Sequence, residues 1–344
     1  MQIRRALIRE RNDVVMESLE LDHEEPRAGE ALLKTRASFI SAGTELANYT
    51  GLDPTVDEPG AWNSYPWPPG YSNVSEVVAI GEGVTEVSEG DRVYTFGKHC
   101  SHYHFSGFGS DLIVKVPDGL NDDTAAAARM AEVAITALQV SDVSLNDWVA
   151  VFGLGSVGNL CAQFFQLSGG RVIGVDPFEP RRNLAQKVGI EHVVGGSEGE
   201  VASAIAELTG DEGAHTTVDA VGDSRVIRQC ANSTASFGEV IVLGSPRASI
   251  EGDLTDLTRP VHWKWITFKG ALEWRIPLMP GRGIRHSTRG NLENIFDLIQ
   301  RGRLKVGELI SHRMDPENIK EAYDGLLNKK DEYWGVVLDW TNGR

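Results

Sequence analysis

The chain has 344 residues, of which 41% are hydrophobic and 24% charged, and its formal net charge is −16. This composition predicts a globular protein long enough for two domains and excludes a disordered chain. The excess of acidic residues argues against nucleic acid or an anionic membrane surface as a partner, because both require a basic face.

The cysteines and the first residues of the chain indicate the cellular compartment of the protein. Cys100, Cys161 and Cys230 lie far apart and form no C-x-x-C pair, which is typical of a reducing environment. Met1 is followed by a strand-like stretch, and no apolar run approaches the roughly 20 residues of a membrane span. We therefore expect a soluble, cytoplasmic protein.

The first 115 residues have the pattern of a β-rich region. Short stretches that alternate or run apolar are separated by Gly, Pro and Asp, as in strands joined by turns. The predicted strands are residues 3–8, 14–19, 31–39, 74–80, 91–96 and 110–114. No helical period stands out there, and the first predicted helix is the Ala-rich stretch 124–140.

From about residue 145 the pattern changes to strands that alternate with helices. Strands are predicted at 148–152, 171–175, 192–194, 216–220 and 239–243, and helices at about 156–168, 180–188, 199–208 and 224–235. This alternation predicts a parallel sheet covered by helices on both faces. After Gly270 the pattern is mixed, with helices at 291–301 and 316–329 and a closing strand at 333–340. Asp315 and Pro316 suit the N-cap and first position of the second helix.

Residues 148–176 carry the most specific pattern in the chain. An apolar stretch leads into Gly153-Leu154-Gly155-Ser156-Val157-Gly158, and a helical stretch and a second apolar strand follow, ending in Asp176. In such a unit the first glycine permits a tight turn, the second lets the backbone approach a pyrophosphate, and the third permits close packing. The helix N-terminus offers free N–H groups to the phosphates. Asp176 follows Gly158 by 18 residues, near the spacing of an acid that binds ribose hydroxyls. The unit therefore predicts a dinucleotide-binding site.

The order of motifs along the chain resembles that of the medium-chain dehydrogenase/reductase superfamily. Besides the glycine turn, the resemblance depends on residues 90–93, 116–120, 135–137, 218–222, 238–244, 321–323 and 335–338. It implies an α/β fold with two domains. A β-rich, GroES-like catalytic domain would comprise residues 1–122 and 273–344, and a Rossmann domain with a doubly wound parallel sheet would comprise residues 123–272.

The zinc-binding segments of that superfamily are altered here. Where its zinc-dependent branch has a cysteine, a histidine and a glutamate as ligands, this chain has Ala42, Tyr71 and Ser72. Alanine has no donor atom and a serine hydroxyl is a poor zinc ligand. Glu132 stands where the superfamily often supplies a further ligand, but one carboxylate cannot hold zinc alone. The four clustered cysteines of the structural zinc lobe are also absent from the sequence, and we expect no zinc.

A second group of potential ligands, His99, Cys100, His102 and His104, follows residues 90–93. Adjacent residues in an extended segment point to opposite faces, so His102 and His104 could face together while His99 would need a turn. We expect a polar loop bordering the active-site cleft, with metal binding by this group as the alternative.

Without a metal, hydrogen bonds have to stabilise the charge on the substrate oxygen. The resemblance places Thr44 at the hydroxyl that touches this oxygen, whereas Ala47 replaces the relay histidine. Tyr71 could donate to a carbonyl oxygen, or fill the vacated metal space as a packed aromatic. The candidate bases are Glu132, Glu45, His99 and His102. Against these roles, Thr44 could cap a turn, Glu132 could be a structural acid, the histidines could be solvated, and Glu45 is favoured as the partner of an arginine.

The resemblance also assigns the cofactor contacts. Ser156 and Val157 would meet the pyrophosphate through their backbone, and Asp176 would bind the adenosine ribose. The nicotinamide would be flanked by Thr136, Val221, Gly222, Leu243, Gly244, Ser245, Ala271 and Leu272. Since a carboxylate repels a 2′-phosphate, Asp176 favours NAD over NADP. Arg181 and Arg182 could soften that preference or cover the adenine, which leaves NADP open.

Aromatic side chains mark the predicted substrate region. Residues 62–69 include Trp62 and Trp67 and several prolines, which prevent a regular helix, and this loop could wall the substrate cleft. Trp263, Trp265 and Trp274 could contribute from the other side or form a dimer contact.

The predicted activity is that of an NAD(P)-dependent, zinc-independent oxidoreductase. It would interconvert a secondary alcohol, such as a polyol, sugar, cyclitol or hydroxyalkyl compound, and its ketone. The alternatives are reduction of an activated C=C bond, as in quinone and enoyl reductases, and a cofactor-binding role without catalysis. We expect a small-molecule substrate, no nucleic-acid or membrane partner, and a homodimer or homotetramer.

Overall fold

The computed structural model describes residues 1–247 and 250–342 and divides the chain into two compact units. Unit 1 comprises Met1–Arg129, Ile276–Gly302 and Ile310–Arg344, and unit 2 comprises Met130–Arg275 and Arg303–Leu309. The sequence placed the domain boundaries at 122/123 and 272/273 and assigned residues 303–309 to the β-rich domain, whereas here they belong to unit 2. Residues 303–309 join unit 2 because the Gln163 side chain donates to the Lys305 carbonyl at 3.2 Å and accepts its N–H at 2.8 Å.

Unit 1 is built on a largely antiparallel sheet in the order β14-β15-β3-β4-β5-β7, with β6 paired to β3, and on a separate hairpin of β1 and β2. The strands are β1 (Gln2–Glu10), β2 (Asp13–Glu20), β3 (Ala31–Phe39), β4 (Asn73–Ile80), β5 (Arg92–Thr95), β6 (His102–Phe105), β7 (Ile113–Lys115), β14 (His312–Met314) and β15 (Val336–Asp339). The polar loop expected around residues 99–104 therefore contains a short strand, β6.

The helices of unit 1 include one that the sequence did not predict. They are α1 (Ala42–Thr50), the start of α2 (Asp122–Val140), α8 (Thr288–Gln300) and α9 (Ile319–Asn328). Helix α1 lacks a side-chain N-cap and ends at Gly51 with φ 70°, so its local signals are weak. It packs on α9, where the rings of Tyr49 and Tyr323 meet edge to face at 5.2 Å. The helix predicted at 316–329 starts instead as a 3₁₀ turn, Pro316–Asn318, capped by Asp315.

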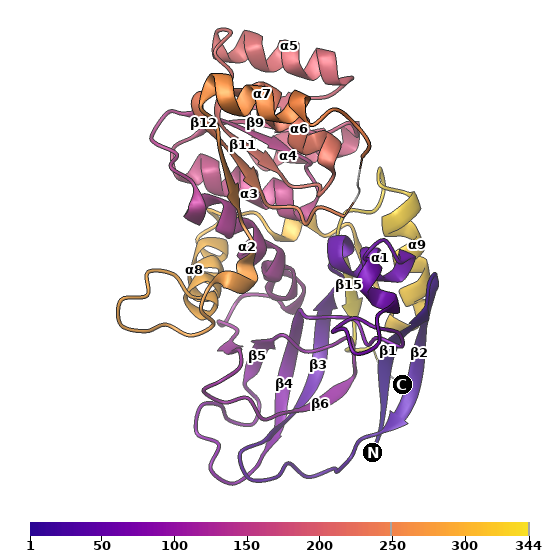
Figure 1. The fold of residues 1–344 in the computed structure, drawn as a ribbon. Helices are drawn as coiled ribbons and strands as arrows, with labels where there is room; N and C mark the ends of the chain where they lie inside the picture. The colour runs from indigo at the N-terminus through magenta and orange to yellow at the C-terminus, as the bar shows by residue number, and fades with distance from the viewer. Residues whose placement is uncertain (248–249, 343–344) are drawn as a thin grey trace. The chain divides into compact units, whose positions relative to one another are not determined.

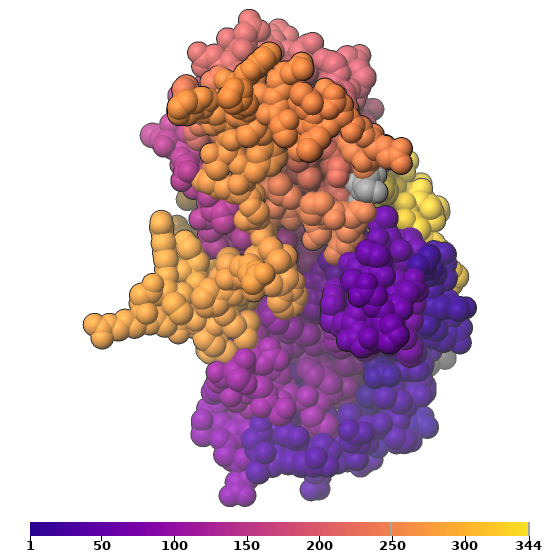
Figure 2. Space-filling model, viewed as in Figure 1, coloured from indigo at the N-terminus to yellow at the C-terminus, as the bar shows by residue number. Residues whose placement is uncertain are grey.

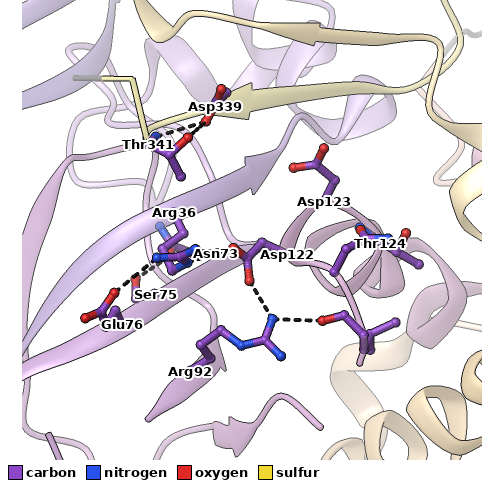
Figure 3. A network of polar contacts seen from close by, with 12 residues as sticks. Arg36, Asn73, Ser75, Glu76, Arg92, Asp122, Asp123, Thr124, Asp339 and Thr341 are labelled. Atoms are coloured by element: carbon purple, nitrogen blue, oxygen red, sulfur yellow. Dashed lines mark hydrogen bonds and ion pairs between the residues drawn. The ribbon is translucent and has the colours of Figure 1, made fainter. Parts of the chain in front are cut away.

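A network of charged groups fastens the start of α2 to the sheet of unit 1 (Figure 3). Asp122 accepts hydrogen bonds from Arg36 on β3 at 2.7 Å and from Arg92 on β5 at 2.8 Å. Arg92 also donates to the carbonyls of Leu120 at 2.8 Å and Pro117 at 3.0 Å. The motif at residues 90–93 thus holds the motif at residues 116–120 in place, and Asp122 suits the positive end of the helix dipole.

Unit 2 is a parallel sheet in the order β10-β9-β8-β11-β12-β13. The strands are β8 (Trp148–Phe152), β9 (Arg171–Val175), β10 (His192–Val194), β11 (Ala214–Asp219), β12 (Thr234–Val242) and β13 (Thr267–Gly270). The helices between them are α3 (Ser156–Leu167), α4 (Glu179–Lys187), α5 (Glu198–Thr209), α6 (Ser224–Ser233) and α7 (Thr255–Lys264). Numbered from β8, this strand order is 3-2-1-4-5-6, the doubly wound order predicted from the sequence.

Helices α5, α6 and α7 lie together over one face of this sheet (Figure 1). Their apolar side chains form one core with Ala150 and Phe152 of β8. Val149 points to the opposite face, where the end of α3 lies. Helix α7 was not predicted because Pro260 interrupts its pattern.

Two further features concern the surface. Residues 280–285 in unit 1 are exposed throughout and belong to the loop that projects before α8 (Figure 2). Within the described residues, no helix combines the length and apolar character needed to cross a bilayer.

Candidate cofactor and active sites

The glycine turn after β8 has the geometry that the sequence pattern predicts. Gly153 has φ 91°, and a Cβ there would lie 2.6 Å from Cγ2 of Val221. A Cβ on Gly158 would lie 1.8 Å from the carbonyl oxygen of Gly153, so any side chain would push α3 away from β8. Gly155, at the N-cap of α3, has no atom closer than 3.8 Å to such a Cβ. The backbone at Gly155 is therefore open to a ligand, and the adjacent Ser156 and Val157 are half-exposed.

Asp176 closes the same end of the sheet. Its carboxylate accepts the N–H groups of Leu154 and Phe178, each at 2.8 Å, and it is only 2% exposed. Each carboxylate oxygen has a second lone pair with which it can accept a ribose hydroxyl.

Two arginines lie beside this carboxylate in different roles. The guanidinium of Arg181 is 3.8 Å from Asp176 and stacks over the Phe178 ring. Burial lowers the pKa of Arg181, and Asp176 opposes that shift. Arg182 donates to the carbonyls of Asp176 at 2.7 Å and Pro177 at 2.9 Å, so it anchors the backbone after β9.

Asp219, at the end of β11, organises two of the predicted nicotinamide segments. Its carboxylate accepts the N–H of Val221 at 2.9 Å and of Gly222 at 3.2 Å. Its backbone carbonyl accepts the N–H of Leu243 at 3.0 Å and of Gly244 at 2.7 Å. Burial raises the pKa of Asp219 to about 6, against the effect of the two hydrogen bonds from the backbone.

The remaining predicted cofactor residues differ in exposure. Val221 is 54% exposed, and Leu272 and Ser245 are also exposed, whereas Ala271 is buried and its N–H is bound to Val242. Thr136 on α2 is buried, and within the described residues its hydroxyl has no hydrogen-bond partner. An orphaned buried hydroxyl and an open helix N-terminus are features that a bound dinucleotide would satisfy.

Unit 1 contains a buried polar cluster centred on Glu45, which is fully buried. The Glu45 carboxylate accepts the backbone N–H of Ser41 at 2.8 Å and the hydroxyl of Tyr323 at 2.5 Å, and it contacts Nε2 of His99 at 3.0 Å. The other ring nitrogen of His99 contacts the hydroxyl of Ser38 at 2.8 Å. The partners that the structure gives this carboxylate are Ser41, Tyr323 and His99, not the arginine expected from the sequence.

Tyr71 adjoins this cluster through Ser41. Its hydroxyl donates to Oγ of Ser41, and its ring lies 5.2 Å from the guanidinium of the buried Arg129. Burial raises the pKa of Tyr71, while Arg129, Ser41 and Thr44 act in the opposite direction. The phenol therefore keeps its proton at neutral pH and is a donor rather than a base. Thr44 lies inside α1 and is half-buried.

The other predicted active-site residues are dispersed over the chain. Glu132 is fully buried on α2. His102 is half-buried and contacts the hydroxyl of Ser101, and burial lowers its pKa. Trp62 is 61% exposed and meets Trp67 edge to face at 5.6 Å, whereas Trp67 is 3% exposed and belongs to the core of unit 1.

The three histidines of the segment 99–104 have three different environments. His99 contacts Glu45, His102 contacts Ser101, and Nε2 of His104 is bound to the carbonyl of His23. They therefore do not form one ligand group, because His99 precedes β6 and each of the three rings contacts a different neighbour.

The residues at the catalytic zinc position of the superfamily do not fit a zinc ion. Ala42 has no donor, the hydroxyl of Tyr71 donates to Ser41, and the hydroxyl of Ser72 donates to the carbonyl of Ala126. Zinc requires three protein ligands with N, O or S donors.

Sequence reasoning missed several residues that shape these sites. Tyr323 and Asp219 were noted only as parts of motifs, and their contacts with Glu45 and with the Val221 loop depend on the fold. Lys98 was not considered as a site residue. Its ammonium lies 5.7 Å from the Trp67 ring, and burial lowers its pKa.

Comparisons with known proteins agree with this architecture. A family model described as zinc-binding dehydrogenase matches residues 156–275. D-guloside 3-dehydrogenase of Escherichia coli (strain K12) is 24% identical over 324 residues, which cover 89% of this chain and 91% of that protein.

Solved structures are similar over almost the whole chain. An E. coli oxidoreductase/dehydrogenase of unknown specificity has a TM-score of 0.81 at 18% identity, covering 98% of this chain and 99% of its own. Acetophenone reductase from Geotrichum candidum, in complex with NAD, has a TM-score of 0.78 at 19% identity, covering 99% and 98%.

The strand order and the glycine turn of unit 2 define a Rossmann-type dinucleotide-binding unit, which here accompanies a β-rich unit of the GroES-like kind. The family model and the curated relatives support the medium-chain dehydrogenase/reductase superfamily, so the resemblance drawn from the motifs of the chain is confirmed.

Proposed function

We propose that the protein is an NAD(P)-dependent oxidoreductase that interconverts a secondary alcohol and its ketone without a catalytic zinc ion. The observation that carries this proposal is the β8–α3–β9 unit, in which Gly155 is open and Asp176 stands at the end of the second strand. A relative named as a dehydrogenase of a sugar derivative supports chemistry at a CH–OH group and favours a polyol, sugar or cyclitol as substrate.

The cofactor is proposed to be NAD, with NADP open. The nicotinamide, when bound, accepts or donates the hydride, while the protein orients it. The N–H groups at the start of α3 would bind the pyrophosphate and Asp176 the adenosine ribose. Arg181 lies close enough to Asp176 to offset part of its charge, which is why a 2′-phosphate is not excluded.

Hydrogen bonds replace the metal in this proposal. Tyr71 is a protonated phenol beside Thr44 and Arg129, and it would donate to the substrate oxygen as negative charge develops there. Ser41 connects Tyr71 to the Glu45 cluster, because its hydroxyl accepts the phenol proton and its N–H donates to the carboxylate. When substrate binds, the same phenol proton would turn from Ser41 to the substrate oxygen. Glu45, His99 and Tyr323 would hold this donor in place.

The base that exchanges the alcohol proton is proposed to be Glu132, which is fully buried on α2. Trp62, which is mostly exposed, is the aromatic residue proposed to face the substrate.

The test is a substrate screen over polyols, cyclitols, hydroxyalkyl aromatics and quinones, followed by nicotinamide absorbance. With the best alcohol, Tyr71→Phe and Glu132→Gln should each lower kcat/KM by about 10²-fold if the residue is the proton-transfer group. Tyr333→Phe, a change at a buried tyrosine whose ring stacks on His312, is the matched control.

The outcomes separate the proposal from its rivals. Oxidation of NAD(P)H by quinones or enones, with no turnover of alcohols, would indicate C=C reduction. Cofactor binding without turnover of any compound would indicate the non-catalytic role. Normal rates in both variants would refute the acid–base assignment.

We also propose that a second copy of the chain covers the β13 edge of unit 2. β13 is the terminal strand of its sheet, and Trp265 and Phe237, which are 72% and 73% exposed, meet edge to face next to it. An unpaired strand bordered by exposed aromatic residues is suited to pairing with its own copy. Light scattering should give the mass of a dimer or tetramer, and Trp265→Ser should shift it toward the monomer.

A further inference from the structure

Three side chains outside the proposed active site converge in unit 1. His23 and Glu30 lie in the segment between β2 and β3, and His104 lies on β6. Nε2 of His23 is 2.7 Å from Oε2 of Glu30, and Nδ1 of His104 is 3.8 Å from the same oxygen. One nitrogen or oxygen from each of the three residues lies within 4.8 Å of the other two. Within the described residues this is the one such group of His, Cys, Asp or Glu side chains.

The hydrogen bonds of His104 fix its tautomer. Its Nε2 lies 2.9 Å from the carbonyl oxygen of His23, and a carbonyl can only accept, so Nε2 carries the proton. Nδ1 is then a lone pair in the neutral ring, and this buried atom has no hydrogen-bond partner within the described residues. A histidine that donates one N–H to a backbone carbonyl has its other nitrogen oriented as metal ligands usually are.

The charges around the lone pair on Nδ1 of His104 favour a bound cation. Nδ1 of His104 faces the carboxylate of Glu30, and a lone pair facing a carboxylate is repulsive unless positive charge lies between them. Glu30 is held in this position by the N–H of Arg27 at 2.9 Å. The rings of His23 and His104 stack with centroids 4.0 Å apart, so protonating both would place two like charges in contact. A divalent ion between Nδ1 of His104 and the Glu30 carboxylate would supply positive charge without protonating either ring.

The group is separate from the Glu45 cluster. His104 pairs with Leu32 on β3, whereas the ring of His99 contacts Ser38 on the same strand. Six residues of a strand span about 20 Å. An ion at the first position therefore cannot act on chemistry at the second.

We propose that Nε2 of His23, Oε2 of Glu30 and Nδ1 of His104 bind one divalent transition-metal ion of the Zn²⁺ type. Two imidazoles and one carboxylate are a donor set that suits Zn²⁺ or Co²⁺, with water completing the coordination. The stacked rings have to open by rotation about χ2, which is a soft torsion in histidine. The neutral His23 ring moves its proton to Nδ1, so binding requires no net proton release. The ion fastens the segment between β2 and β3 to β6 and has a structural role.

The experiment uses the full chain, stripped with a chelator and titrated with ZnCl₂ by calorimetry and by thermal denaturation. Wild type should bind one equivalent and gain in Tm. His104→Gln and Glu30→Gln should weaken binding at least tenfold and remove the Tm gain, with NADH binding retained. His102→Gln, on the same strand and the same face, is the matched control and should bind zinc as wild type does.

Two results would overturn the site: no zinc binding by wild type, or equal binding by wild type and by the His104 and Glu30 variants. If these variants fail to fold, the absorption spectrum of Co²⁺ added to the wild-type protein tests whether the site binds a metal ion. Visible bands of a four- or five-coordinate ion support the site, and the spectrum of hydrated Co²⁺ alone refutes it.

Discussion

Gly155→Ala and Gly158→Ala form a matched pair that separates the stability of unit 2 from its proposed cofactor binding. A Cβ on Gly158 would lie 1.8 Å from the carbonyl oxygen and 2.9 Å from the carbonyl carbon of Gly153. Both distances are far inside van der Waals contact, and both neighbours are backbone atoms that move only with β8 or α3. Overpacking of this kind costs about 1–3 kcal/mol or more. For a unit of this size the loss should lower Tm by roughly 3–10 °C.

Gly155→Ala is expected to preserve the stability of unit 2 while weakening cofactor binding. Its φ is −63°, and the atom nearest to an added Cβ is Nη1 of Arg181 at 3.8 Å, so alanine fits the folded chain. A glycine-to-alanine change at a compatible backbone stabilises by about 0.4–1 kcal/mol. The methyl group would, however, occupy the space through which a pyrophosphate approaches the start of α3. NADH affinity should fall at least tenfold, which corresponds to about 1.4 kcal/mol.

The assays are thermal denaturation by circular dichroism and fluorescence titration with NADH. Gly155→Ala should retain or exceed the wild-type Tm while losing cofactor affinity, and Gly158→Ala should lose both. Wild-type NADH affinity in Gly155→Ala would refute the assignment of the glycine turn to the cofactor. A wild-type Tm in Gly158→Ala would refute the packing argument.

Two further predictions concern carboxylates of unit 2. Asp176→Asn keeps an acceptor for one backbone N–H but removes the negative charge that repels a 2′-phosphate. The ratio of NADPH affinity to NADH affinity, measured by fluorescence titration, should therefore rise about tenfold. An unchanged ratio would show that Asp176 does not determine the choice of cofactor. Burial raises the pKa of Asp219 from 3.8 to about 6, so its contribution to stability is full below about pH 4 and is lost as pH rises through about 6. In urea denaturation, wild type should lose on the order of 1–3 kcal/mol relative to Asp219→Asn over that interval, and a difference independent of pH would contradict the shift.

The local pattern alone determined the β8–α3–β9 unit of this protein. A tight turn, a helix start and two short apolar strands are encoded by neighbouring residues, so the unit from Trp148 to Asp176 was readable, and the predicted strand 31–39 coincides with β3. Helices α1 and α7 were not readable. The first lacks a capping side chain and depends on packing against α9, and the second contains Pro260 in its interior.

Only the tertiary structure decided the polar sites of unit 1. Glu45, His99 and Tyr323 converge although 278 residues separate the first from the last, because α1 and α9 pack together. His99 and His104 lie within six residues of the sequence and yet contact Glu45 and His23, since the strand β6 and the segment before it direct their rings to different partners. Proximity along the chain predicts local conformation, whereas the partner of a buried charge depends on which distant segment folds against it.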